Sequence, residues 1–276
     1  MSELARAAEL IAGADALLVC AGAGMGVDSG LPDFRGAEGF WRAYPPYARL
    51  GLNFAEVADP RHFRADPHLA WGFYGHRLAL YRKTVPHQGF HLLREWGSRL
   101  PGGVRVFTSN VDGQFQVAGF EQVAECHGSI HHLQCVEPCS DDVWPADDLE
   151  VLVDEDSMRA LPPLPACRNC GGLARPNILM FGDFDWVPHR GQAQLDALTA
   201  WRRDHRNLVV VELGAGLAVP TVRRYAELAS AATGALIRIN PREPEIRHNR
   251  GISLPMNALA ALSALATHLP DGDART

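Results

Sequence analysis

Four of the six cysteines have the spacing of a metal site. Cys167 and Cys170 are separated by two residues and followed by two glycines, so both thiolates can reach one tetrahedral ion. Their partners, Cys135 and Cys139, are separated by three residues. Because four thiolates leave no open coordination position, the pattern predicts a structural zinc ion rather than a catalytic one. The wider first pair leaves open the alternative of reduced thiols in a site that has lost its metal.

A glycine-rich stretch near the N-terminus has the composition of a phosphate-binding loop. Gly22, Ala23 and Gly24 follow a short apolar run, and glycines at such a place permit a tight turn with backbone amides close to a pyrophosphate. Val27 stands where a complete dinucleotide motif has its third glycine. A turn that holds no ligand is therefore the alternative.

Residues 29–36 contain more glycine, proline, charged and aromatic residues than the start of an ordinary helix does. Asp33, Phe34 and Arg35 follow Leu31 and Pro32, and this sequence forces an extended turn. The side chains of Phe34 and Arg35 are then placed to cover a bound cofactor. The alternative is that Asp33 and Arg35 only hold the loop in place.

Polar residues also end a second apolar run. Ser109, Asn110 and Asp112 follow it, and the last two face the same side of an extended segment, where both can contact one ligand. Asparagine and aspartate are equally common as simple turn formers. His127 is flanked by residues that turn the chain, and an imidazole titrates close to neutral pH, as a general base requires. A lone histidine is more often structural, which is the alternative here.

Strands and helices that would position these residues alternate along the chain. Apolar runs at residues 16–20, 104–108, 208–213 and 235–239 each lead into a loop that contains Gly, Ser or Asn. Near-continuous apolar strands are typical of a parallel sheet that is buried on both faces. Helical patterns lie between or beside them, at residues 2–12, 87–96, 221–232 and 257–268. The alternation predicts an α/β fold, a Rossmann-like open parallel sheet with ligands at the carboxyl ends of its strands.

Two stretches interrupt this alternation. Residues 44–86 contain many aromatic residues and prolines and include a helical pattern at 67–83, whereas residues 129–175 contain the four cysteines. We expect both insertions to form a smaller lobe, made of a helical part (44–86) and a zinc module (129–175). The large Rossmann-like domain then consists of residues 1–43, 87–128 and 176–276, and the whole chain, 1–276, is a single unit.

Charge and hydropathy exclude several classes of protein. With 26 basic and 32 acidic residues, the net charge of −6 gives no general attraction to nucleic acid or to an anionic membrane. No apolar run approaches the roughly 20 residues of a membrane span, and no signal peptide is visible. We therefore expect a cytoplasmic protein with reduced cysteines and with neither nucleic acid nor membrane as a partner. The oligomeric state is not predicted.

Taken together, these motifs resemble the sirtuins, the NAD-dependent protein lysine deacylases, and in particular a divergent bacterial-type member. The resemblance extends over residues 16–239 and keeps the family's order of motifs. Residues 22–36 are similar to the block G-A-G-x-S-x-x-S-G-I-P-D-F-R-G, residues 108–112 to T-Q-N-I-D, and residues 125–129 to E-x-H-G-S. Residues 167–182 resemble C-x-x-C-G-G-x-x-R-P-x-x-V-x-F-G.

The resemblance implies NAD as cosubstrate, structural zinc, and an acyl-lysine protein or peptide as substrate, with nicotinamide and O-acyl-ADP-ribose as products. It implies catalytic roles for His127, as general base, and for Asn110 and Asp112, at the nicotinamide pocket. It further implies that Phe181 and Gly182 bind the substrate. The residues implied to bind NAD are Gly22, Ala23, Gly24, Asp33, Phe34, Arg35, Ser109, Asn110, Asp112, Gly214, Ala215, Gly216 and Asn240.

Tyr74 and Arg77 extend the resemblance to the acyl group. They lie three residues apart, on one face of the predicted helix, like the pair with which one sirtuin class binds acidic acyl groups such as succinyl. A buried arginine beside a tyrosine hydroxyl can pair with a carboxylate. The alternative is a packed tyrosine and a solvated arginine.

Departures from the family pattern cluster at the expected crevice. Ser109 replaces glutamine, Asp183 replaces glutamate, and Gly214-Ala215-Gly216 replaces G-T-S, which removes two hydroxyls. These losses keep two other functions open: a protein ADP-ribosyltransferase or NAD hydrolase on the same fold, and a catalytically weak NAD-sensing interaction module. The presence of His127 counts against both.

Overall fold

The large sheet of the protein is parallel throughout. The computed structural model describes residues 1–32, 36–231, 235–246 and 251–269. The sheet has six strands in the order β11-β10-β9-β1-β2-β3. Their bounds are β1 (Ala16–Ala21), β2 (Val104–Thr108), β3 (Val123–Glu125), β9 (Leu208–Leu213), β10 (Leu236–Ile239) and β11 (Gly251–Leu254). This architecture confirms the predicted α/β fold with an open parallel sheet.

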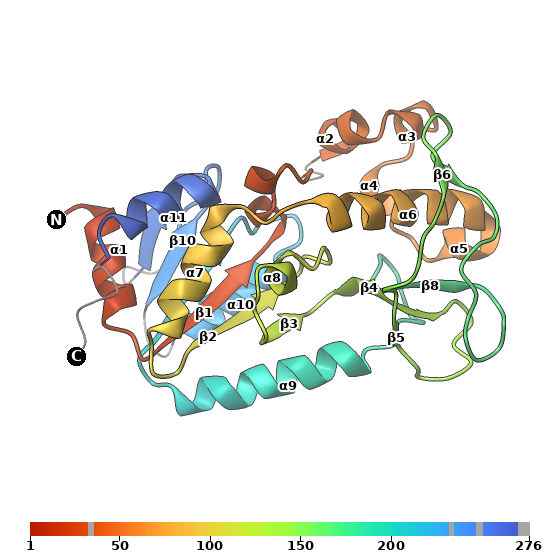
Figure 1. The fold of residues 1–276 in the computed structure, drawn as a ribbon. Helices are drawn as coiled ribbons and strands as arrows, with labels where there is room; N and C mark the ends of the chain where they lie inside the picture. Colours follow the sequence, from red (N-terminus) through yellow and green to blue (C-terminus); the bar gives the residue numbers. More distant parts are fainter. Residues whose placement is uncertain (33–35, 232–234, 247–250, 270–276) are drawn as a thin grey trace.

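Helices cover both faces of this sheet (Figure 1). One face packs against α1 (Glu3–Ala12), α7 (Gln88–Ser98) and α11 (Ala258–Ala266), and the other against α9 (His189–Asp204) and α10 (Thr221–Ser230). Two apolar cores result, one on each side of β1, whose six residues are all buried. Since both faces of the central strands are covered, most of their residues are apolar, which is what made them recognisable in the sequence.

Helix ends differ from the predicted ones by a few residues, for identifiable reasons. Ser2 and His87 stand before α1 and α7 rather than inside them, because each side chain accepts a hydrogen bond from a backbone N–H of the first turn. The edge strands β3 and β11 have no counterpart among the predicted strands. β3 has only three residues, and the residues of β11, at the edge of the sheet, alternate between half-buried and buried instead of forming an apolar run.

The second part of the molecule combines both predicted insertions around one aromatic core. It contains α2 (Gly36–Ala43), α3 (Pro45–Arg49), α4 (Phe54–Val57), α5 (Arg61–Ala65) and α6 (Pro67–Lys83). It also contains a small sheet in the order β5-β4-β8 and the hairpin β6–β7, with bounds β4 (Gly128–Cys135), β5 (Trp144–Pro145), β6 (Val153–Asp154), β7 (Arg159–Ala160) and β8 (Ala174–Ile178).

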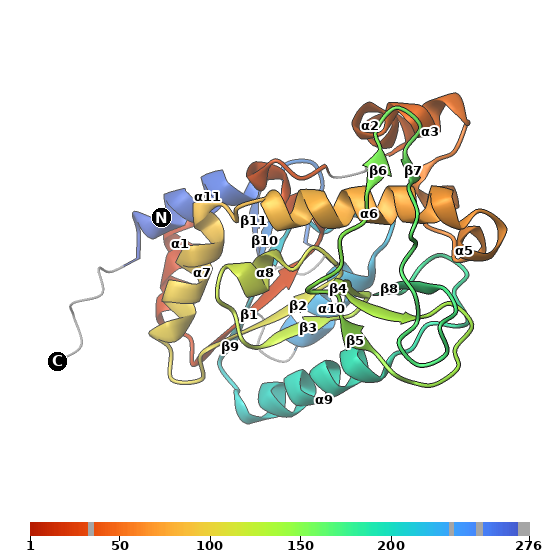
Figure 2. The same ribbon diagram turned by 45° about the vertical axis from the view of Figure 1, so that its right-hand side comes forward.

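The hairpin β6–β7 reaches across to α2 and α3 (Figure 2). There the Arg49 guanidinium donates to the carbonyl of Asp156 at 2.8 Å. Phe40 of α2 belongs to the aromatic core, although residues 1–43 were assigned to the large domain. The exact division into two lobes stays a prediction.

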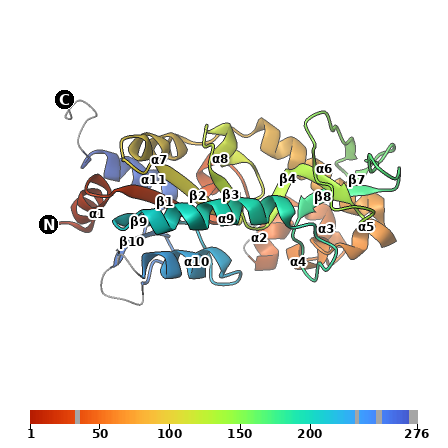
Figure 3. The same ribbon diagram turned by 90° about the horizontal axis from the view of Figure 1, so that it is seen from below.

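Helix α9 runs along the molecule from the large sheet toward β4 and β8 (Figure 3). It was not among the predicted helices, because most of its residues are polar and few of them, Gly191, Leu198 and Trp201, are buried. Within the described part of the chain, no helix combines the length and apolar character that crossing a bilayer requires.

Candidate functional site

Two glycine loops, after β1 and β9, touch through their backbones. The Gly22 N–H donates to the carbonyl of Leu213 at 2.9 Å, and the Gly24 N–H donates to that of Gly214 at 3.1 Å. A Cβ added to Gly24 would lie 2.6 Å from the Cα of Gly214, and one added to Gly214 would lie 2.4 Å from the Cα of Gly24. Glycine is therefore required at both positions, because a side chain on either residue would prevent the two loops from packing together.

The next carbonyl of the second loop is held from two directions. The Asn240 side-chain amide donates to the carbonyl of Ala215 at 2.9 Å, and the Arg223 guanidinium of α10 donates to it at 3.1 Å. The Asn240 amide oxygen in turn accepts from the N–H groups of Arg242 and Glu243 at 3.0 and 3.1 Å. Gly214, Ala215 and Asn240 thus lie together as the sequence predicted, whereas nothing in the sequence pointed to Arg223.

A small hollow of about 70 Å³ opens beside these loops, lined by Gly24, Val27, Asp28, Gly214, Ile239, Pro241, Arg242, Asn257 and Ala258. Of the other predicted cofactor residues in the two loops, Ala23 is exposed and Gly216 is half-buried. Asp28, Arg242 and Asn257 supply polar side chains to the otherwise largely apolar lining of the hollow, and the hollow lies at the carboxyl edge of the sheet, where ligands bind in open parallel sheets. The predicted residues Asp33, Phe34 and Arg35 lie outside the described part of the chain.

A buried ion pair under the second loop escaped sequence reasoning. Arg238 on β10 lies opposite Glu212 on β9, and its Nε and Nη2 each donate to that carboxylate at 2.8 Å. The same guanidinium reaches Glu227 of α10 at 3.0 Å. The sequence does contain a signal for this ion pair. Two otherwise apolar strands, β9 and β10, each contain one charged residue, and the two charges are of opposite sign.

Asn110 and Asp112 follow β2 at the same edge of the sheet. The Asn110 side-chain amide donates to the carbonyl of Gly22 at 3.0 Å, so this residue is in contact with the first glycine loop. Asp112 is buried, and burial raises the pKa of its carboxyl to about 6. One carboxylate oxygen accepts from the Gln114 N–H at 2.9 Å, so the side chain has a fixed orientation. Ser109, also predicted, is half-buried between them and β2.

His127 lies between β3 and β4, and its segment pairs with the one that carries Asp112. The Cys126 N–H donates to the carbonyl of Thr108 at 2.9 Å, and the Ile130 N–H donates to that of Val111 at 3.0 Å. Burial lowers the pKa of the His127 imidazole, so the ring is neutral at neutral pH and able to accept a proton. His127, Asn110 and Asp112 therefore lie on adjoining backbone segments.

All four predicted cysteine ligands come together. Their Sγ atoms lie within 4.8 Å of one another, with 3.7 Å between Cys135 and Cys170 and between Cys139 and Cys167. A tetrahedral zinc ion with bonds of about 2.3 Å requires sulfurs about 3.8 Å apart. The donor set and its geometry thus fit zinc, and the extra residue between Cys135 and Cys139 does not prevent it.

Residues 180–187 form the loop between β8 and α9 that contains Phe181 and Gly182. Phe181 is 43% exposed and Phe184 is 97% exposed, so the loop presents apolar side chains to solvent. Asp183, the departure from the family's glutamate, is fully buried and accepts from both Nη atoms of Arg175, at 2.7 and 2.9 Å. Aspartate in place of the family's glutamate therefore still provides a buried carboxylate at this position.

Tyr74 and Arg77 are both buried in α6. The sequence pattern placed the hydroxyl of Tyr74 beside Arg77. In the structure, the Nε and Nη2 of Arg77 donate to the hydroxyl of Tyr81 at 2.9 and 2.7 Å. Tyr74 instead stacks on Phe63, with ring centroids 5.6 Å apart. Tyr81 is four residues, one helical turn, from Arg77, a spacing that sequence reasoning overlooked. The solvated arginine of the alternative is wrong, because Arg77 is only 6% exposed.

A sequence model of the Sir2 family matches residues 22–218, which is most of the chain. The protein belongs to the Sir2 family. Its relatives in that family include NAD-dependent protein deacylase 1 of Archaeoglobus fulgidus, which is 30% identical over 92% of this chain and 92% of its own length. NAD-dependent protein deacylase 1 of Pseudomonas aeruginosa is 30% identical over 88% of this chain and 89% of its own.

Solved structures of Sir2 family proteins have the same fold. A Sir2 homologue in complex with NAD superposes with a TM-score of 0.74 at 27% identity, covering 97% of this chain and 93% of that one. A Sir2 homologue mutant in complex with ADP-ribose gives a TM-score of 0.73 at 27% identity, covering 97% and 96%. The resemblance that the motifs indicated is thus confirmed for the Sir2 family and its fold.

Proposed function

We propose that this Sir2 family member is an NAD-dependent protein lysine deacylase that produces nicotinamide and O-acyl-ADP-ribose. One observation carries the proposal: the neutral imidazole of His127 lies on a segment paired with that of Asn110 and Asp112, and Asn110 contacts the glycine loops. Relatives named NAD-dependent protein deacylase match the chain over nearly its full length. When bound, NAD supplies a ribose carbon with a good leaving group.

Each group of residues then has a distinct task. The contacts among Gly22, Gly24 and Gly214 hold the two loops together beside the hollow proposed for the pyrophosphate, and Asn240 fixes the shape of the second loop. Asn110 and Asp112 bind the carboxamide of the leaving nicotinamide. His127, neutral because it is buried, takes the proton from a ribose hydroxyl.

Residues 180–187 and 216–220 are proposed to receive the substrate peptide as an added strand. Phe181, Phe184, Leu217 and Val219 are exposed apolar side chains on these two segments. They offer contacts for the residues around the acyl-lysine, since an extended peptide places alternate side chains on opposite sides.

The acyl preference is proposed to include acidic acyl groups such as succinyl. Arg77 is a buried cation whose guanidinium lies 5.0 Å from the Phe73 ring and 5.3 Å from the Tyr81 ring. A carboxylate at the end of an acyl chain would find there a charge partner that water does not screen. We expect Arg77 and Tyr81, with Tyr74 behind them, to select such groups.

The experiment is incubation of the protein and NAD with acetyl-, succinyl- and long-chain acyl-lysine peptides, with all products followed by mass spectrometry. Free lysine peptide together with O-acyl-ADP-ribose, both lost in His127→Ala, is the expected result. Release of nicotinamide with ADP-ribose on protein or free in solution, and without deacylation, would instead identify the transferase or hydrolase. No turnover with any peptide would leave the NAD-sensing module.

A further inference from the structure

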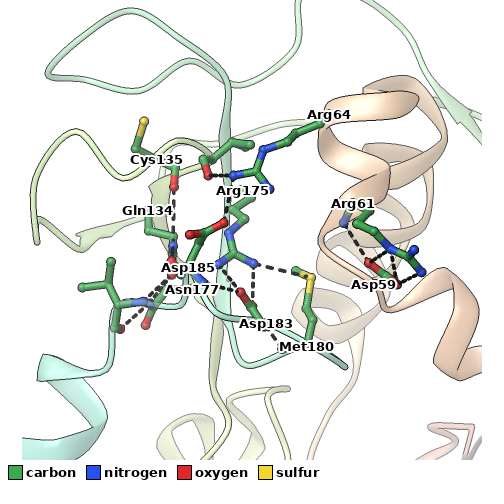
Figure 4. A network of polar contacts seen from close by, with 12 residues as sticks. Asp59, Arg61, Arg64, Gln134, Cys135, Arg175, Asn177, Met180, Asp183 and Asp185 are labelled. Carbon is green, nitrogen blue, oxygen red and sulfur yellow. Dashed lines mark hydrogen bonds and ion pairs between the residues drawn. The ribbon is translucent and has the colours of Figure 1, made fainter.

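The loop of residues 180–187, which the proposed function assigns to the peptide, has no secondary structure of its own that fixes it. Side chains from other segments hold it instead (Figure 4). The Arg175 guanidinium of β8 holds Asp183, and the carbonyl of Ala58 accepts from the Phe181 N–H at 3.0 Å. Two further contacts, from Gln134 and Arg64, join the loop to the four-cysteine module.

Gln134 lies on β4, directly before the metal ligand Cys135, and is fully buried. Its Oε1 accepts from the Val187 N–H at 3.0 Å and from the Asn177 side-chain amide at 2.9 Å. Its Nε2 donates to the carbonyl of Asp185 at 2.7 Å. One side chain therefore pairs an acceptor and a donor of the loop backbone that lie two residues apart. Removing it leaves the buried Val187 N–H and the half-buried Asp185 carbonyl without this partner.

Arg64, on α5, makes the corresponding contacts from the solvent side. Its guanidinium donates to both carboxylate oxygens of Glu137, which lies between the ligands Cys135 and Cys139. The same guanidinium donates to Asp185 at 2.8 Å. Asp185 is thus held at its carbonyl by Gln134 and at its carboxylate by Arg64.

We propose that Gln134 and Arg64 are positioning residues for the acyl-lysine peptide: they anchor residues 180–187 to the cysteine module and so keep the peptide-binding loop in its binding conformation. This proposal rests on the proposed function. A loop that is already ordered loses less conformational entropy when a peptide adds to it, so the anchors act on peptide binding. Among the described residues, their hydrogen bonds reach neither the glycine loops nor the segment of Asn110 and Asp112, so we expect them to affect peptide binding more than NAD binding.

The test compares Gln134→Met, which keeps the length of the side chain but not its hydrogen bonds, with Arg64→Gln and the conservative Arg64→Lys. Arg159→Gln is the matched control, because Arg159 forms an equally exposed ion pair, with Asp66 at 2.7 Å, that does not reach the loop. We expect Gln134→Met to raise the KM for the acyl peptide about tenfold, and Arg64→Gln about threefold. The KM for NAD and kcat stay within about twofold, Arg64→Lys recovers part of the loss, and the control behaves as wild type.

A second readout separates this proposal from the proposed function. Amide hydrogen exchange of residues 180–187, measured without any substrate, is expected to speed up in Gln134→Met and Arg64→Gln and in no other segment as much. This exchange measurement tests the role of Gln134 and Arg64 even if the wild-type protein deacylates none of the peptides. Unchanged exchange in both variants would overturn the proposal, and so would an equal rise in the KM values for NAD and for the peptide.

Discussion

Gly24 and Gly214 lie so close together that neither position has room for a side chain. The Gly24 N–H donates to the Gly214 carbonyl at 3.1 Å, and an added Cβ on either residue would lie at most 2.6 Å from the other's backbone. These two residues are 190 positions apart in the chain. Their contact joins the loops after β1 and β9, the two strands that pair at the centre of the large sheet.

Gly214→Ala is therefore expected to disrupt the nucleotide crevice. Besides the clash, Gly214 has φ +60°, which alanine adopts at a cost, so we expect a loss of about 2–4 kcal/mol in the free energy of unfolding. Chemical denaturation measures this loss, and the KM for NAD rises in the same variant. Gly13→Ala is the control, because Gly13 ends α1 with φ −90° and faces only the Glu9 carbonyl. Equal stability of the two variants would show that the loops do not touch.

The raised pKa of Asp112 leads us to expect opposite pH dependences of stability and of activity. Its raised pKa, about 6, means that folding favours the protonated carboxyl. The stability that this carboxyl contributes is complete below its ordinary value near 4 and is lost as the pH rises through about 6. Asp112→Asn should therefore be more stable than wild type by about 1–3 kcal/mol at pH 7.5, and not at pH 4. A constant difference across this range would contradict the assignment.

Activity should respond in the other direction. If the carboxylate of Asp112 accepts from the nicotinamide carboxamide, activity of the wild type falls as the pH drops through about 6. Burial lowers the pKa of the His127 imidazole, and protonation of this ring on acidification adds to the loss. A pH profile of kcat/KM for NAD measures this, and a profile centred above pH 7 would speak against both groups.

Zinc should be present at one ion per chain and should be held only by the four clustered cysteines. Cys167→Ser removes a ligand, so we expect loss of the metal and a lower Tm. Cys126→Ala, which changes a cysteine outside the cluster, keeps the zinc. Elemental analysis and thermal unfolding check both variants, and zinc retained at full content in Cys167→Ser would refute the site.

The buried pair of Arg175 and Asp183 should be much more sensitive than any surface pair. Asp183→Ala leaves a buried guanidinium without its partner, and we expect a loss of about 3–5 kcal/mol in the free energy of unfolding. Arg168→Gln, which breaks the exposed pair with Asp142, should cost less than about 1 kcal/mol. Urea unfolding measures the free energy of unfolding of both variants. A smaller loss for Asp183→Ala than for Arg168→Gln would contradict the structure.

Arg77 should determine the acyl preference. Arg77→Met removes the buried cation but keeps an apolar side chain of similar length, so desuccinylation should fall about a hundredfold relative to deacetylation. Tyr81→Phe removes the hydroxyl that orients the guanidinium and should have a smaller effect in the same direction. Competition between acetyl and succinyl peptides measures the ratio. If the ratio is unchanged in Arg77→Met, Arg77 has only a packing role.

The sequence was sufficient for features that depend on short-range order. The buried strands are mostly apolar, and the four cysteines have metal-like spacing, so the parallel sheet and the cluster followed from local patterns. Contacts that depend on the fold were not accessible in this way. Most of the hydrogen bonds of Gln134 and Arg223 go to backbone groups, which are present at every residue and leave no trace in a sequence. Tyr81 lies one helical turn from Arg77, outside the Tyr74–Arg77 pair on which the family resemblance rests.

The central claim is that NAD is consumed as the acyl group leaves lysine, and the stoichiometry of the reaction tests it most directly. Nicotinamide, deacylated peptide and O-acyl-ADP-ribose should form in equal amounts, only in the presence of NAD, and none of them in His127→Ala. Free carboxylic acid released from the peptide without consumption of NAD, or nicotinamide formed at the same rate with and without acyl peptide, would contradict the account.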